Sequence, residues 1–355
     1  MRRTTSAGPA AAPRAARWIA RVAALAAAAA AATPVAAHGT VPSEPPSVTS
    51  LLLGWTFEPL PTIGITVALL VWRWAVRCVD IAHPANPVPR SRTLAFVGGM
   101  AAIAVALLSG IDRYDTALFS VHMVQHVLLT LVAAPLIALS GPITLALRAA
   151  SPHTRRTILL PILHARVTRI LAFPVVAWLV LAIVMWVSHF SALFDAALED
   201  PLIHDIEHGL YLGAALLFWW PAVARDPAPW RMSHPVRAMY TFLQMSQNTF
   251  LAVVLLNVQE VLYHHYATLV RPWGLPPLAD QQLAAAIMWV TGDLIFLGAI
   301  MTILVGWSRA ESRDTARADR QAAIDLAGIR DREARLAERL SRERDGTQPG
   351  SGVSR

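Results

Sequence analysis

The sequence predicts an all-α membrane protein, a polytopic bundle of about seven transmembrane helices, and two observations support this fold class. Of the 355 residues, 55% are hydrophobic and only 15% are charged, with a mean hydropathy of +0.47, whereas soluble domains carry about 25% charged residues. Apolar runs of roughly 20 residues recur along the chain, and a run of that length can cross a bilayer as a helix. A soluble multidomain protein is therefore a poor interpretation.

The apolar segments define the expected spans. They lie near residues 61–79, 94–111, 120–147, 170–189, 204–224, 237–262 and 283–307, and together they make a seven-span bundle over 61–307. The third segment is long and contains Pro135, Gly141 and Pro142. Because a proline removes a backbone donor, we expect this segment to kink or to leave the membrane early.

Two regions precede the bundle. Residues 1–37 combine several arginines with an alanine-rich stretch that ends in Val35-Ala36-Ala37, which is typical of a signal peptide or, if it is retained, of an N-terminal anchor. Residues 38–60 would then form an extracytoplasmic segment. Cleavage after Ala37 would make His38 the amino terminus, and its amine and imidazole could together chelate Cu(II).

Arginine distribution predicts the orientation. The loops after the first, third and fifth spans carry ten arginines, whereas the loops after the second, fourth and sixth carry only Arg113 and Arg271. The arginine-rich loops belong in the cytoplasm by the positive-inside rule. The tail, residues 308–355, is then also cytoplasmic, and its mixed charges at helical spacing predict a solvated, charged helix.

Composition also argues against several functions. The chain has no lysine, so it cannot form the Schiff base of a seven-helix retinal protein. Its net charge of +7 is spread over short loops, without a basic groove or aromatic platform for nucleic acid. The single cysteine, Cys78, cannot form an internal disulfide and is expected to be a packing residue.

Two histidine pairs begin apolar segments on the predicted outer side. His122 and His126 open the third span, and His204 and His208 open the fifth. A spacing of four places both rings of a pair on one helical face, about one turn apart. Further polar residues are expected at the same outer rim, namely Asp112, Asp115, Gln125, Ser188, His189, Glu207, Tyr211, Glu260, His264, His265, Asp280, Gln281 and Gln282.

Such a concentration of imidazoles favours a metal site at the outer mouth of the bundle. Neutral imidazole binds Cu, Zn, Fe and Ni, and Met123, beside the first pair, adds a soft ligand that favours Cu(I). The structural alternative is that the histidines cap helices or bond to carboxylates, and we prefer it for single histidines such as His264 and His189. One b-type haem between His126 and His208 is a further alternative, but no histidine within the spans could hold a second haem near the inner side.

A second polar set lies deeper in the predicted membrane. Span six carries Gln244, Gln247 and Asn248 on one face, and span seven carries Asp293. An acid near mid-bilayer is costly and usually faces the bundle interior. It could pair with the amides of span six as interhelical glue or form part of an ion path, and both interpretations stay open.

Several segments resemble the caa3-type cytochrome c oxidase assembly factor family (CtaG type). They are Trp55–Pro59, Ser120–Leu129, Ala134–Leu136, Gly141-Pro142, His204–His208, Trp219–Pro221, Asp280–Gln282 and Met288-Trp289. The resemblance covers roughly residues 50–307, and the His-Met-x-x-His segment is its most specific part. The chain departs from the family where Ala284, Ala285 and Ala286 replace glycines, which concerns helix contacts rather than ligands.

The resemblance implies a multi-pass protein of the bacterial plasma membrane that matures cytochrome oxidase by handling or delivering copper on the extracytoplasmic side, without catalysis of its own. The expected partners are haem-copper oxidase subunits, a periplasmic copper chaperone and the lipid bilayer. The expected metal ligands are His122, Met123, His126, His204 and His208, with Asp112, Glu207, His264 and Asp280 as supporting or transient partners. Alternatives are a haem b-binding redox protein, a copper uptake or homeostasis protein, and a metal-free scaffold for the oxidase.

Overall fold

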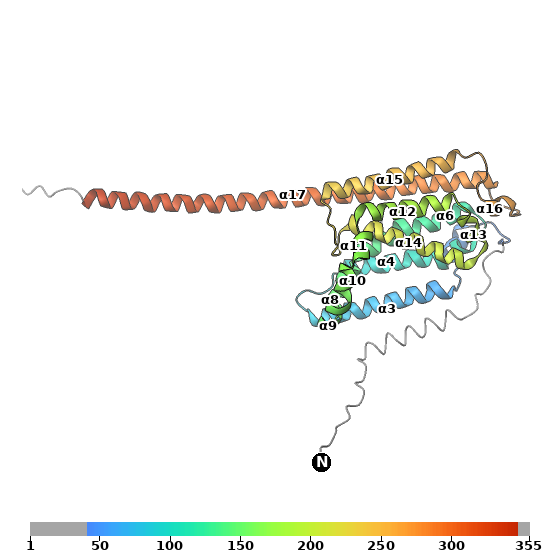
Figure 1. The fold of residues 1–355 in the computed structure, drawn as a ribbon, viewed down its shortest axis with the longest axis horizontal. Coiled ribbons are helices and arrows are strands. Elements are labelled where there is room, and N and C mark those ends of the chain that lie inside the picture. Colours follow the sequence, from blue (N-terminus) through green and yellow to red (C-terminus); the bar gives the residue numbers. More distant parts are fainter. Residues whose placement is uncertain (1–40, 347–355) are drawn as a thin grey trace, which may run out of the picture. The chain divides into compact units, whose positions relative to one another are not determined.

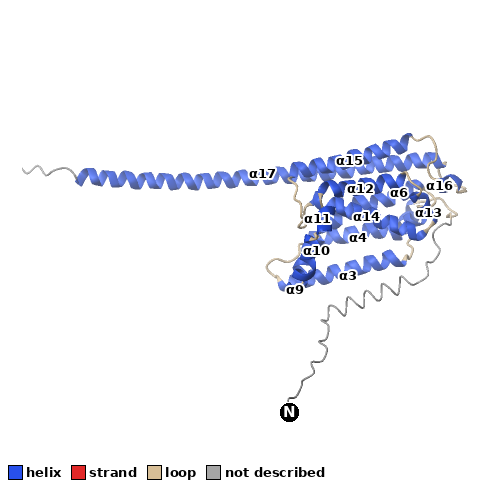
Figure 2. Cartoon of the chain, in the orientation of Figure 1, coloured by secondary structure: helices blue, strands red, loops and turns tan. Residues whose placement is uncertain are grey.

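The computed structural model describes residues 41–346, and within that range every regular element is helical (Figures 1 and 2). The expected signal peptide and His38 lie outside the described residues. The first half of the chain contains α2 (Val48–Leu53), α3 (Pro59–Ala82), α4 (Arg90–Leu108), α5 (Gly110–Tyr114), α6 (Phe119–Val127), the π-helical turn η1 (Leu128–Ala133), α7 (Ala134–Ser140), α8 (Pro142–Ala149), α9 (Pro152–Thr154), η2 (Arg155–Leu159), α10 (Leu160–His164) and α11 (Arg166–Leu171). The second half contains α12 (Pro174–His189), α13 (Leu193–Glu199), α14 (Pro201–Val223), α15 (His234–Asn257), α16 (His264–Thr268) and α17 (Pro277–Gly346).

Helices occupy all seven predicted spans, but fewer than seven satisfy both length and apolarity. Among the described residues four helical segments do so, and a fifth is added if α12 and α13, which meet at a bend of 69°, count as one broken span. The helices α14 and α15 fall short because they carry the histidine pair and a polar face, respectively. The all-helical architecture is therefore confirmed, and the count of seven spans stays a prediction.

One predicted boundary was wrong. We expected the sixth span to reach residue 262, whereas α15 ends at Asn257 and non-helical backbone leads to α16. The residues after Asn257 instead contact the start of α17: the backbone N–H of Leu262 donates to Gln281 Oε1 at 2.9 Å, and Gln281 Nε2 donates to the Glu260 carbonyl at 3.1 Å. These hydrogen bonds satisfy backbone groups that a longer helix would have used internally.

The third segment is interrupted where its sequence predicts. The π-helical turn η1 immediately precedes Pro135, which cannot donate a backbone hydrogen bond, and the released Thr130 carbonyl accepts the indole N–H of Trp219 at 2.9 Å. The helix α7 then ends at Gly141, whose φ of +72° is unfavourable for other residues. Pro135 thus accounts for the interruption, and Trp219 of α14 binds the carbonyl that the interruption releases.

Small residues let α4 pack closely against this interrupted helix. A Cβ atom on Gly99 would lie 2.8 Å from Ile137 Cγ1 and 3.2 Å from the Ala133 carbonyl oxygen, so a larger residue there would force the helices apart. One turn earlier in α4, Phe96 stacks on Trp72 of α3, with ring centroids 4.1 Å apart. These contacts hold α3, α4 and the α6–α7 segment as one packed layer.

The residues after Ile300 form a separate compact unit, Met301–Arg355, described here by itself. Its described part is the continuation of α17, and most of its side chains from Ser308 onward are exposed. Pairs one turn apart, such as Gln321 and Asp325 at 3.0 Å and Glu338 and Arg342, contact each other along its surface. A charged helix was predicted for this segment, and the described residues are helical as far as Gly346.

Candidate metal centre

Both histidine-bearing helices begin with a carboxylate that binds their first backbone N–H groups. Asp280, from the start of α17, accepts the Phe119 N–H at 2.7 Å and the Ser120 hydroxyl at 2.5 Å at the beginning of α6. Asp200 accepts the N–H groups of Leu202 and Ile203 at 2.8 and 3.3 Å at the beginning of α14. Acceptors at this position satisfy orphan donors and oppose the helix dipole. The first histidine of each pair therefore lies one turn inside a firmly defined helix start.

The four paired histidines meet in the interior. None is more than 5% exposed. The Nε2 atoms of His122 and His126 lie 2.9 Å apart, and the ring centroids of His122 and His204 lie 5.3 Å apart. His208 has its ring centroid 6.2 Å from that of His122 and 5.9 Å from that of His126. The two pairs, predicted separately from the sequence, thus form one group, which we call the histidine cluster (His122, His126, His204 and His208).

Two buried carboxylates border the histidine cluster. Glu207 Oε2 is 3.8 Å from His122 Nε2, and Asp115 Oδ2 is 3.7 Å from His204 Nε2. Both residues are at most 1% exposed, and neither oxygen of Glu207 accepts a hydrogen bond from the described residues. Burial and the nearby Asp112 raise the pKa of the Asp115 carboxyl, in the loop before α6, well above its usual range. A bound cation would reverse that effect, since it favours the ionised carboxylate.

The donor atoms are close enough to share an ion. Ligand atoms of His122, His126 and His208 all lie within 4.8 Å of one another, and the same holds for Asp115, His122 and His204. In a tetrahedral site with bonds of about 2.0 Å the ligand atoms are roughly 3.3 Å apart, so small side-chain rotations suffice. His122 belongs to both groups and is the geometric centre of the site.

Gln125 and Asp112 orient the cluster through hydrogen bonds. The Gln125 amide nitrogen donates to the Ala106 carbonyl at 3.0 Å and to Asp112 Oδ1 at 3.3 Å, which turns its oxygen toward His208 Nε2 at 3.0 Å. Asp112 therefore acts on the histidines through Gln125, as an orienting partner rather than by contact. Of the two aspartates before α6, the one near a cluster histidine is Asp115, which we placed at the outer rim but did not select as a ligand or supporting partner.

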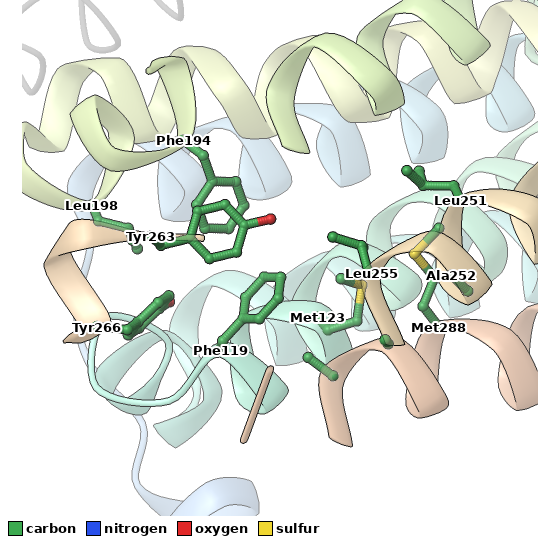
Figure 3. Close-up of a cluster of buried hydrophobic side chains, with 12 residues drawn as sticks. Phe119, Met123, Phe194, Leu198, Leu251, Ala252, Leu255, Tyr263, Tyr266 and Met288 are labelled. Carbon is green, nitrogen blue, oxygen red and sulfur yellow. The ribbon is translucent and has the colours of Figure 1, made fainter. Parts of the chain in front are cut away.

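Three other predicted residues lie elsewhere. Asp280 caps α6 and has Arg271 Nη1 at 4.0 Å, so its oxygens are engaged away from the cluster. His264 is exposed at the start of α16, where its backbone N–H donates to Asp195 at 3.3 Å. Met123 is buried in an apolar cluster with Phe119, and Figure 3 shows its thioether among these side chains.

Aromatic rings close the cluster from the loop side. Phe194 of α13, fully buried, has its ring centroid 4.8 Å from that of His122 and 4.4 Å from that of Tyr263. Phe119 packs edge-on against both Phe194 and Tyr263, at 5.3 and 4.7 Å (Figure 3). Figure 1 shows α13 and α16 at the end of the bundle where α6 begins. The cluster is thus buried in surroundings of low dielectric, which strengthens charge interactions inside.

The deeper polar residues are paired in part, since Gln244 Oε1 and Gln247 Nε2 have no hydrogen-bond partner among the described residues. Asp293 accepts the Thr249 hydroxyl at 2.7 Å and the Trp289 indole N–H at 3.0 Å. Asn248 donates to the Met288 carbonyl at 3.3 Å, and Gln244 donates to Gln247 at 2.7 Å. Of the two interpretations left open by the sequence, pairing of Asp293 with the amides of span six does not occur among the described hydrogen bonds, and Asp293 pairs instead with Thr249 of that span.

The fold and this site define a helical membrane protein with buried histidines and carboxylates at one end of its bundle. Residues 68–310 match the family described as "Cytochrome c oxidase caa3 assembly factor (Caa3_CtaG)", and the chain belongs to that family. The resemblance inferred from the sequence is confirmed, although the match begins after the Trp55–Pro59 segment.

Mycobacterial proteins are similar to the chain. Uncharacterized proteins of Mycobacterium bovis and Mycobacterium tuberculosis are each 30% identical over 291 residues, covering 80% of this chain and 44% of theirs. One from Mycobacterium leprae is 29% identical over 287 residues, covering 79% of this chain and 43% of its own length. The chain therefore spans less than half the length of these relatives. No solved structure gave a significant match.

Proposed function

We propose that the protein binds copper at the histidine cluster and passes it on during maturation of a haem-copper oxidase, on the outer side of the bacterial plasma membrane. The observation that carries the proposal is the convergence of His122, His126, His204 and His208, all buried, from two helices in a chain of this family. Copper here is cargo, and the protein performs no catalysis of its own.

The balance of charge at the cluster supports a metal cation as its ligand. Neutral imidazoles are good copper ligands, and the carboxylates of Glu207 and Asp115 offer compensating charge 3.8 and 3.7 Å from histidine nitrogens. A buried carboxylate without a hydrogen-bond donor is costly unless a cation joins it. Two overlapping ligand sets that share His122 also suit an ion that must be released, since each set can hold it in turn.

Sidedness is supported by charges at the opposite end of the bundle. The Arg237 side chain donates to the carbonyls of Ala222 and Val223 at 2.7 and 3.0 Å at the end of α14, and Asp226 caps the start of α8. These contacts lie at the helix ends joined by the arginine-rich loops, which the positive-inside rule assigns to the cytoplasm. The histidine cluster then lies on the extracytoplasmic side of the membrane, the side of periplasmic copper chaperones and exported oxidase domains.

Haem is the second candidate, and the packing disfavours it. The cavities that border the cluster measure about 20 and 120 Å³, whereas pockets for drug-sized ligands measure about 300–1,000 Å³. His126 Nε2, one of the two ring nitrogens that could bind a haem iron, also lies 2.9 Å from His122 Nε2, so a neighbouring side chain occupies the space that a macrocycle bound there would need. Copper uptake uses the same site and differs only in the destination of the ion.

Metal analysis and a visible spectrum of the detergent-purified protein test the proposal. We expect about one equivalent of copper at the histidine cluster and no Soret band. The double variant His122→Ala/His208→Ala should lose that equivalent, whereas His153→Ala, an exposed histidine of α9, should retain it. A Soret band that the double variant abolishes would establish haem instead.

Cells that depend on this chain separate delivery from scaffolding. If the protein supplies copper, the double variant should insert normally and yet leave the oxidase deficient in copper. If it is a metal-free scaffold, the oxidase should mature normally with the double variant. If cells with the double variant make normal oxidase but grow poorly when copper is limiting, a role in copper uptake is favoured.

A further inference from the structure

A small cavity lies beside the histidine cluster, and His126 lines it. It measures about 20 Å³, enough for one water molecule or one ion. Residues of α6, α12, α14, α15 and α17 line it, so it lies where five helices meet. Its lining includes two histidines and three methionines, which are His126, His189, Met123, Met185 and Met288.

His189 is held as metal-binding histidines are. Its Nδ1 lies 2.7 Å from the Met185 carbonyl oxygen, and since a carbonyl only accepts hydrogen bonds, Nδ1 carries the proton. The Nε2 lone pair is therefore available. That atom is buried and has no hydrogen-bond partner among the described residues, and the side chain is 2% exposed. Metal-ligating imidazoles characteristically donate their other N–H to a backbone carbonyl in this way.

The sulfur atoms give the cavity a character that the histidine cluster lacks. Met123, Met185 and Met288 come from α6, α12 and α17, and Figure 3 shows two of them pointing into the same apolar interior. The Met185 thioether is fixed by the Gln244 amide, whose nitrogen lies 3.6 Å from the sulfur. Neutral thioethers are soft ligands that select Cu(I).

No carboxylate lines this cavity, in contrast to the cluster with its two acids. A divalent ion without a counter-charge is expensive in a low-dielectric interior, while a monovalent ion costs much less. The cavity is thus suited to Cu(I) and poorly suited to Cu(II) or Zn²⁺.

We propose that this cavity is a second copper site, specific for Cu(I), in which His189 and the methionine thioethers hold the ion next to the histidine cluster. The inference rests on the proposed function for the identity of the cargo. His126 lines the cavity and also belongs to the cluster, with its ring centroid 6.5 Å from that of His189. The ion would pass between the two sites by exchange of ligands around His126, without a change of oxidation state.

An anaerobic titration of the full-length protein in detergent, with bicinchoninate competing for Cu(I), tests the proposal. The wild type should bind about two Cu(I), with sulfur ligands visible in the copper X-ray absorption spectrum. The variant Met185→Leu/Met288→Leu, which preserves volume and apolarity, should bind about one and lose the sulfur signal. Met239→Leu, an exposed methionine of α15, is the matched control and should bind two.

The cluster variant His122→Ala/His208→Ala separates the two proposals. It should lose one Cu(I) and keep the sulfur-ligated ion. A wild type that binds one Cu(I), lost in the cluster variant and unaffected in the methionine variant, would overturn the second site and leave the proposed function intact. A wild type that binds no copper would overturn both.

Discussion

Two groups of buried polar residues in this bundle are built differently. In the deep group, Asp293 accepts hydrogen bonds from Thr249 and Trp289, and both of its oxygens are engaged. In the histidine cluster, by contrast, neither oxygen of Glu207 accepts a hydrogen bond, and the Nδ1 atoms of His122 and His126 have no partner among the described residues. Asp293 thus has the partners that structural polar groups usually have, whereas the cluster and its bordering carboxylates carry several unsatisfied buried atoms that the proposed copper ion would engage.

The largest effect on copper binding is expected from removal of His122, which both ligand sets share. We expect His122→Ala to weaken copper binding by at least about 100-fold, or roughly 2.7 kcal/mol, because His122 belongs to both ligand sets. Metal-free protein should keep most of its thermal stability, since removal of the unpartnered Nδ1 atom of His122 offsets loss of its Nε2 contact with His126. Competition titration and thermal unfolding in detergent measure the two effects. Loss of several degrees in the metal-free protein would mean that the cluster is structural.

The cap on α6 should give the largest effect on stability. Asp280→Ala leaves the Phe119 N–H and the Ser120 hydroxyl without their acceptor, and charge-assisted hydrogen bonds of this kind each contribute about 1.5–3 kcal/mol. Thermal unfolding of the metal-free protein should show the loss. Asp200→Ala at the more exposed cap of α14 is the comparison and should cost about 1 kcal/mol. Equal effects would contradict the special role of Asp280.

A smaller loss of copper affinity is expected at Gln125, which links His208 to Asp112 and the Ala106 carbonyl. Gln125→Leu keeps the volume but removes the contact that orients His208, and loss of such orienting partners typically weakens metal binding by about 10- to 100-fold. Asp112→Asn should cost less, since it acts only through Gln125. We expect the loss of copper affinity to decrease in the order His122→Ala, Gln125→Leu, Asp112→Asn. A reversed order would refute the roles assigned to Gln125 and Asp112 as orienting residues.

The smallest effect is expected in the deep group. Thr249→Val removes one of two hydrogen bonds to Asp293, and such bonds in membrane proteins contribute about 0.6 kcal/mol on average. Unfolding should shift slightly, while copper stoichiometry and affinity should stay at wild-type values. A changed affinity would show that Asp293 belongs to an ion path after all.

The helices and the histidine pairs were predictable because their signals are periodic and local. Apolar length gave the segments, and the spacing of four put His122 with His126 and His204 with His208. The choice of Asp115 over Asp112 was not predictable, since it depends on the short helix α5, whose last turn sends these two carboxylates in different directions.

The proposed role of His189 could not be predicted from the sequence either. As a single histidine at the end of a span it favoured a structural role, and only three-dimensional packing reveals that one ring nitrogen is fixed by the Met185 carbonyl while the other is left over. Likewise, Asp280 was expected near the metal, whereas it lies against the α6 backbone. Sequence identifies which residue types gather at one end, and tertiary contacts decide which atoms meet.

The Asp280 contact has a consequence for biogenesis. The carboxylate lies 161 residues after the backbone N–H that it binds at Phe119, so α6 receives its cap only when α17 has been synthesised and inserted. A ribosome-bound chain that lacks α17 would present the histidines of α6 on an unanchored helix end. We therefore expect the start of α6 to become fixed only after α17 has inserted, as one of the last steps in assembly of the bundle.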